Sequence, residues 1–107
     1  MGLTRVFKET VVARVERNPA FAQALLDEAT TLLISGEAET ARLILRDLVN
    51  ATLGFEQLEK LTDVPSRSLH RMLSSKGNPS MDNLAAILSA VSSNIPRSRN
   101  TRQRKVA

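Results

Sequence analysis

Residues 54–84, GFEQLEKLTDVPSRSLHRMLSSKGNPSMDNL, carry the clearest structural pattern in the chain. Its apolar residues fit two short crossing helices joined by a tight break. They place Leu58 and Leu61 on the first helix, Val64 in the break, and Leu69, Met72 and Leu73 on the second. Asn78-Pro79 then requires an extended or turn connection to a further helix. This order of elements predicts a helix-turn-helix.

The outward positions of the second helix are polar and basic. No acidic residue lies between Val64 and Met81. A surface helix selected only for stability would more often place Glu or Asp four residues from Arg67 and Arg71, so we favour a DNA contact over a solvated stripe. Arg71 is the first candidate for a base edge or phosphate, Arg67 and Ser66 for contacts near the helix start, and Lys76 for a phosphate. The full set of candidate DNA-binding residues is Gln57, Ser66, Arg67, Ser68, His70, Arg71, Lys76 and Asn78.

The run SLHRMLSSKGNP, followed by a spaced Leu84, resembles the helix-turn-helix of the Xre/Cro-like class. It is most similar to the small bacterial antitoxin branch, the HigA-like addiction-module antidotes, and the resemblance extends over residues 18–91. The resemblance implies an Xre/lambda-repressor-like fold, double-stranded operator DNA as a partner, and a RelE/HigB-like or ParE-like toxin as a second partner. Similar proteins also act as stand-alone or phage regulators.

Three residues of the first motif helix and the break depart from that pattern. Phe55 stands where the pattern usually has a Gln that helps to hold a phosphate, Glu59 stands where it has Ala, and Asp63 replaces the usual turn Gly. Pro65 occupies the position where similar proteins usually have a capping Ser. These departures support an alternative function, a helical protein-interaction module that has kept the scaffold and lost DNA binding.

Helix signals continue on both sides of the motif. Thr4 can cap a helix that ends at Arg17, and Asn18 with Pro19 opens another. That second helix has a predicted apolar stripe of Phe21, Leu25, Ala29, Leu32 and Leu33. Gly36 is expected to stop it, and Glu37 and Glu39 are expected in the first turn of the next helix, which Gly54 closes. Its predicted buried face is Ala41, Ile44, Leu45, Leu48 and Thr52.

The last predicted helix begins at Ser80 and ends near Ser93. Its core side is expected to hold Leu84, Ile87, Leu88 and Val91. We therefore expect an all-α protein of about six short helices in one domain, residues 1–96, with an N-terminal helical extension over residues 1–34 and a helix-turn-helix unit over residues 35–96. The extension, from residue 3 to residue 34, is the expected toxin-binding surface.

The net charge of +4 is concentrated at one end of the chain. Residues 97–107 hold five basic residues and no acid, whereas residues 1–96 hold ten basic and eleven acidic residues. The tail has too few apolar residues to pack, so it is expected to be disordered in isolation. It is either a passive solubilising end, or an arm that binds DNA phosphates without reading sequence, or a site for a membrane or another acidic partner.

Other function classes find little support in the composition. There is no Cys, and His70 is the only histidine, so no metal site or cofactor is expected; as a lone His it is either a surface hydrogen-bonding group or a DNA contact. Glu56, Glu59 and Asp63 are interpreted as solvated charges and Gly77-Asn78-Pro79 as a turn, so an enzyme is not expected. No apolar run reaches the roughly 20 residues that span a bilayer, and no signal peptide is recognised, so we expect a cytoplasmic protein. Because one short reading helix covers few base pairs, we also expect a homodimer.

Overall fold

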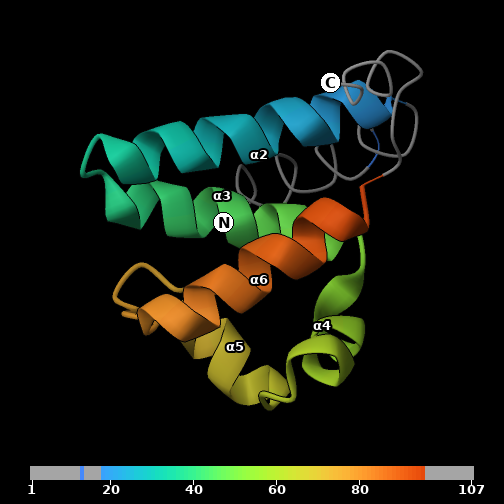
Figure 1. Cartoon of the computed structure of the whole chain (residues 1–107), viewed down its shortest axis with the longest axis vertical. Helices are drawn as coiled ribbons and strands as arrows, with labels where there is room; N and C mark the ends of the chain where they lie inside the picture. The colour runs from blue at the N-terminus through green and yellow to red at the C-terminus, as the bar shows by residue number, and fades with distance from the viewer. Residues whose placement is uncertain (1–12, 14–17, 96–107) are drawn as a thin grey trace, which may run out of the picture.

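A computed structural model describes residue 13 and residues 18–95 of the chain. Within these residues there are five α-helices and no strand (Figure 1). The helices are α2 (Pro19–Ile34), α3 (Ala38–Ala51), α4 (Gly54–Thr62), α5 (Ser66–Met72) and α6 (Met81–Ser93). The predicted all-α class is therefore confirmed for this part of the chain. The helix predicted before residue 18 and the basic tail lie outside the described residues.

The helices form a hairpin and a compact group beneath it. α2 and α3 run antiparallel along one side of the molecule, and α6 lies between this hairpin and the α4–α5 pair (Figure 1). α4 contacts α3, α5 and α6. Among the described residues, one side of α5 faces away from the other helices, and Arg67, His70 and Arg71 are exposed there.

Two helix starts are formed by the residues that the sequence indicates. The side chain of Asn18 accepts a hydrogen bond from the backbone N–H of Ala20 at 3.1 Å, and Pro19 follows as the first residue of α2. The Ser80 hydroxyl accepts a bond from the N–H of Asn83 at 3.1 Å and starts α6, which ends at Ser93 as predicted. Both predicted caps are therefore confirmed. They could be predicted because a cap is formed by residues only two or three positions apart.

The expected boundaries of α3 require correction at both ends. Glu37 is the residue before the helix and makes no side-chain cap, so only Glu39 lies in the first turn. The helix ends at Ala51, where Thr52 bonds back to the Leu48 carbonyl, and Gly54 instead begins α4 with a φ of 81°. The left-handed backbone at Gly54 carries the chain from α3 into α4 without a Cβ clash.

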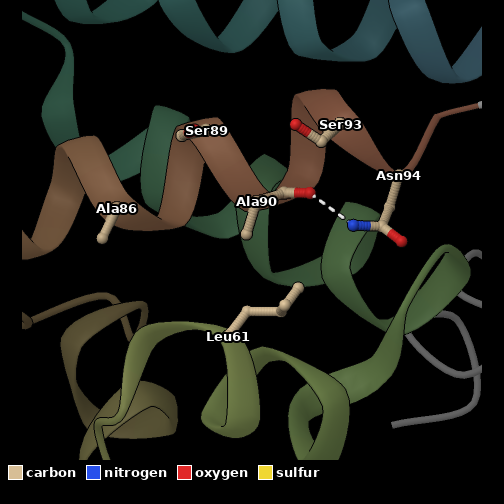
Figure 2. A pocket seen from close by; sticks show the side chains of 6 residues that line it. All are labelled: Leu61, Ala86, Ser89, Ala90, Ser93 and Asn94. Carbon is tan, nitrogen blue, oxygen red and sulfur yellow. Dashed lines mark hydrogen bonds between the residues drawn. The ribbon is translucent and has the colours of Figure 1, made fainter.

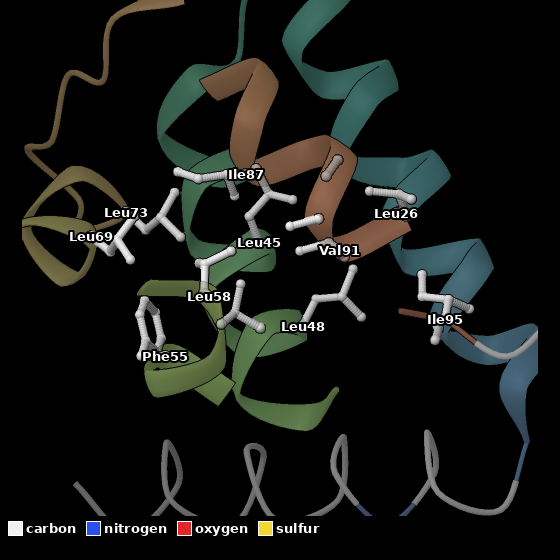
Figure 3. Packing of buried hydrophobic residues seen from close by; sticks show 14 residues of the cluster. Leu26, Leu45, Leu48, Phe55, Leu58, Leu69, Leu73, Ile87, Val91 and Ile95 are labelled. Atoms are coloured by element: carbon white, nitrogen blue, oxygen red, sulfur yellow. The ribbon is translucent and has the colours of Figure 1, made fainter. Parts of the chain in front are cut away.

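A single core joins all five helices (Figure 3). Leu45 and Leu48 of α3, Leu58 of α4 and Ile87 and Val91 of α6 are fully buried. The remaining buried members of the cluster are Ala22, Leu26, Ala29, Val49, Phe55, Leu69, Leu73, Ala90 and Ile95. No charged or polar side chain is buried among the described residues. The core is therefore held by apolar packing alone.

The predicted core faces are only partly correct. On α5 Leu69 and Leu73 are buried as predicted, and Met72 is half-buried. On α6 Ile87 and Val91 are buried as predicted, whereas Leu84 and Leu88 are half-buried, and Ala90 is buried although the pattern omitted it.

On α2 the buried residues are Ala22, Leu26 and Ala29, whereas the predicted Phe21 and Leu25 are only half-buried. Opposite a polar face that includes Gln23 and Asp27, the apolar residues of α2 cover a broad arc, so its pattern fits two adjacent stripes equally well. Four further assignments change: Leu61 is 51% exposed instead of buried, Thr52 and Ile44 are half-buried, and Val49 is buried although the pattern omitted it.

Candidate nucleic-acid interface

Two leucines fix the orientation of α5. Leu69 and Leu73 are fully buried in the core, and Met72 between them packs against it, so this face of α5 points inward and the opposite face points to solvent. Arg67, His70 and Arg71 are exposed, as are Gln57, Lys76 and Asn78 from the same predicted set, while Ser66 and Ser68 are half-buried. The structure thus places six of the eight candidate residues at the surface.

Charge is distributed unevenly over the described residues. They include six cationic and nine acidic side chains, a formal net charge of −3. Three of those cations, Arg67, Arg71 and Lys76, lie in residues 64–81, which contain no acid. α5 and the connection after it therefore form a positively charged surface on an otherwise acidic body.

One acid approaches the start of α5 from another helix. Oε1 of Glu59, on α4, accepts bonds from the Ser66 N–H at 3.1 Å and from the Ser66 hydroxyl at 2.7 Å. These two hydrogen bonds lower the pKa of Glu59, the hydroxyl contributing more than the amide. Glu59 is exposed, as predicted for a solvated charge, but no sequence pattern indicated that its carboxylate also caps α5.

The Glu59 cap explains how Pro65 can precede α5. Pro65 stands at the N-cap position and has no side-chain acceptor to offer, so the free N–H of Ser66 needs a partner from elsewhere. Glu59 supplies it. The Ser66 hydroxyl proton is directed to Glu59, with the Phe55 carbonyl at 3.3 Å as its other acceptor. Ser66 therefore retains only acceptor capacity for a ligand.

The other two departures in the motif also have structural roles. Asp63 ends α4 in the left-handed conformation, at φ 63° and ψ 29°, which is the geometry that a turn glycine would otherwise supply. Phe55 is 7% exposed and stacks on the His70 ring with centroids 3.8 Å apart. The two rings lie 20° from parallel, so one face of the His70 ring is covered by Phe55 while the residue remains exposed.

Sequence reasoning missed two residues that hold the connection between α5 and α6. Arg42 of α3 donates from Nε to the Ser74 carbonyl at 2.9 Å and from Nη2 to the Ser75 carbonyl at 2.7 Å. Gly77 packs so closely on the end of α5 that an added Cβ would overlap the backbone carbonyls of Met72 and Arg71. No local pattern could reveal the Arg42 bonds, since their partners are 32 and 33 residues away.

A shallow groove of about 360 Å³ separates α4 from α6 (Figure 2). It is lined by Leu61, Ala86, Ser89, Ala90, Ser93 and Asn94. The Asn94 amide donates to the Ala90 carbonyl at 2.8 Å, so its N–H is engaged within the rim of the groove. None of the six lining side chains is an acid, a base or a cationic group, so the groove offers no titratable residue.

Two other kinds of site are absent from the described residues. They contain no cluster of three or more His, Cys, Asp or Glu side chains that could hold a metal ion. None of their helices combines the length and the apolar character needed to cross a membrane.

Comparison with known proteins supplies no relative. No protein-family model, curated protein or solved structure matches this chain. The α5 surface must therefore be judged on its own geometry and charge.

Proposed function

We propose that this protein is a sequence-specific DNA-binding regulator. In this proposal α4, the turn at residues 63–65 and α5 form an Xre-like helix-turn-helix, and α5 enters the major groove. Arg67 and Arg71 contact bases or phosphates from within the groove, and Lys76 contacts a phosphate beside it. The His70 ring, held by Phe55, lies in the same interface.

One observation carries the proposal. Buried Leu69 and Leu73 turn Arg67 and Arg71 to solvent on a segment that has no acid, within a described body whose net charge is negative. A cationic, helical surface on an acidic body is what orients a protein toward DNA phosphates. The resemblance of residues 18–91 to antitoxins supports a finer version, in which the protein represses its own operon and binds a RelE/HigB-like or ParE-like toxin.

A second function, a helical protein-interaction module, is favoured by a different observation. The carboxylate of Glu59 accepts the hydrogen bond of the first N–H of α5. Its negative charge would repel a phosphate that approached this end of the helix. Arg67 and Arg71 would then bind an acidic protein surface instead of DNA.

Binding to two DNA duplexes separates these functions. A labelled duplex from directly upstream of the protein's own gene and a shuffled duplex of equal length are titrated at several salt concentrations. A sequence-specific regulator should bind the upstream duplex at least about 10³-fold more tightly. Equal affinity for both duplexes would overturn sequence-specific regulation, and no binding to either would favour the interaction module.

We further propose that the protein acts as a homodimer. A seven-residue helix reads too few base pairs to select one genomic site, whereas two copies related by a two-fold axis read half-sites about one helical turn apart. Light scattering of the free protein and of its complex with the upstream duplex tests the assembly. A monomer in both states would exclude the dimer.

A further inference from the structure

Arg42 lies on α3 but reaches the connection between α5 and α6. Its guanidinium donates two hydrogen bonds, at 2.9 Å to the Ser74 carbonyl and at 2.7 Å to the Ser75 carbonyl. The fixed fork of a guanidinium sets orientation as well as position when two of its N–H groups are bound. Arg42 therefore constrains two consecutive peptide units directly after the end of α5.

The same connection is held from its other side by Gly77. The Gly77 N–H donates to the Ser74 carbonyl at 3.1 Å, so this oxygen accepts bonds from both Gly77 and Arg42. The tight approach of Gly77 to the Met72 carbonyl admits no Cβ. The backbone from residue 74 to residue 77 is thus closed into a small loop whose shared acceptor is the Ser74 carbonyl.

Lys76 stands between these two fixed points. It follows Ser75, whose carbonyl Arg42 binds, and precedes Gly77, while its own side chain is exposed. Because its backbone is already ordered, a contact from its ammonium group has less conformational entropy to lose.

We infer that Arg42 is a positioning residue for DNA binding. It holds the loop over residues 74–77 so that Lys76 meets a phosphate beside the groove that α5 enters. Arg42 is half-buried and acts through the loop, without a DNA contact of its own. The inference rests on the proposed function and assigns a role in it to a residue outside α4 and α5.

Hydrogen exchange tests the first step without DNA. The amide of Gly77 reports directly on the loop, and the amide of Leu73, which bonds to the Leu69 carbonyl, reports on α5 beside it. Arg42→Ala should raise exchange at Gly77 about 3- to 30-fold more than at Leu73. Arg46→Ala is the control, since it removes the same charge one turn further along α3. Arg42→Lys keeps the charge but lacks the fork, so it should also release Gly77, and it serves if the Ala variant folds poorly.

A double-mutant cycle with a duplex of random sequence tests the second step. Lys76→Ala and Arg42→Ala should each weaken binding, and the double variant should bind within about twofold of Lys76→Ala alone, because both changes remove the same phosphate interaction. Arg42→Ala should lower the salt slope by about 0.9, as Lys76→Ala does, and Arg46→Ala should have a smaller effect.

The outcomes are distinct for the inference and for the proposed function. Three results would overturn the positioning role while DNA binding stands. The first is that Arg42→Ala raises amide exchange equally at Gly77 and Leu73. The others are additive losses of duplex affinity in the double-mutant cycle, and equal losses of affinity for Arg42→Ala and Arg46→Ala. A wild-type protein that binds no duplex overturns the proposed function, and the positioning role with it.

Discussion

Glu59 gives the start of α5 a dependence on pH. Its pKa in the folded protein lies below the ordinary value of 4.5 because Ser66 donates two bonds to the charged form. The unfolded chain therefore takes up this proton first as the pH falls. The stabilising contribution is complete above about pH 4.5 and disappears as the pH falls through the folded pKa.

We therefore expect Glu59→Gln to lower the denaturation midpoint at neutral pH. The difference from wild type should shrink below pH 4.5 and vanish once Glu59 is protonated in both states. Glu28→Gln, which removes an exposed acid from α2, controls for net charge. Urea titrations over the acid range measure both differences. A gap between wild type and Glu59→Gln that widens in acid would contradict the capping role.

Arg71 tests which side of α5 faces DNA. The side chain is exposed, so Arg71→Ala should leave folding nearly unchanged. If it pairs with a guanine edge, the variant should lose about 1 to 3 kcal/mol of binding to the upstream duplex and much less to the shuffled one. Lys60→Ala, an exposed cation on α4, is the charge-matched control in the same titration. Wild-type affinity in Arg71→Ala would show that α5 is oriented differently.

At the scale of elements, the loop between α5 and α6 depends, besides the two Arg42 bonds, on the close approach of Gly77 to the end of α5. Gly77→Ala would press a Cβ into the Met72 and Arg71 carbonyls, and these backbone atoms cannot move without shifting the end of α5. We expect a stability loss of about 1 to 3 kcal/mol and weaker binding to every duplex. Gly36→Ala is the control for a loss of stability away from α5. A Cβ at Gly36 would meet no other atom, but the φ of 85° disfavours Ala, so the variant should be less stable and bind DNA with unchanged affinity. Unfolding and duplex titrations separate the two effects.

The elements also show how far sequence reasoning extends. Asn18, Pro19 and Ser80 start helices as predicted because a cap is formed by near neighbours. The fully buried residues Leu69 and Leu73 of the α5 segment, and Ile87 and Val91 of α6, are predictable because each pair recurs at helical spacing. The buried stripe of α2 is harder to predict, since its apolar residues cover a broad arc of the helix and the tertiary contacts decide which part of that arc is buried.

The candidate site was predictable only in part for a related reason. Exposure of Arg67 and Arg71 follows from the positions of Leu69 and Leu73 along α5. The Glu59 cap crosses a turn and the Arg42 bonds cross 32 residues or more, so neither has a local pattern. Pro65 gave an indirect signal for the cap, because a helix that starts after a side chain without an acceptor needs one from elsewhere.

At the scale of the whole molecule, the sign of the charge changes between the body and the tail. The described residues carry a net −3, whereas residues 97–107 hold five basic residues and no acid. An acidic body repels DNA at long range, so attraction to a duplex before contact must come largely from outside the described residues. In the proposed function, Arg67 and Arg71 contact DNA only once α5 is close to it.

Deleting residues 97–107 tests whether the tail supplies the long-range attraction to DNA. The last core residue, Ile95, is retained, so the fold and the denaturation midpoint should be unchanged. Affinity should fall for the upstream and shuffled duplexes alike, and the slope of log K against log salt should decrease by about 0.9 for each phosphate that the shortened chain no longer neutralises. Preference for the upstream duplex should persist, because base contacts from Arg67 and Arg71 do not depend on the tail.

Replacing the five basic residues with Gln in the full-length chain separates charge from length and should reproduce the deletion. Unchanged affinity and slope would identify the tail as a passive end, whereas loss of the preference would place sequence reading in the tail instead of in α5.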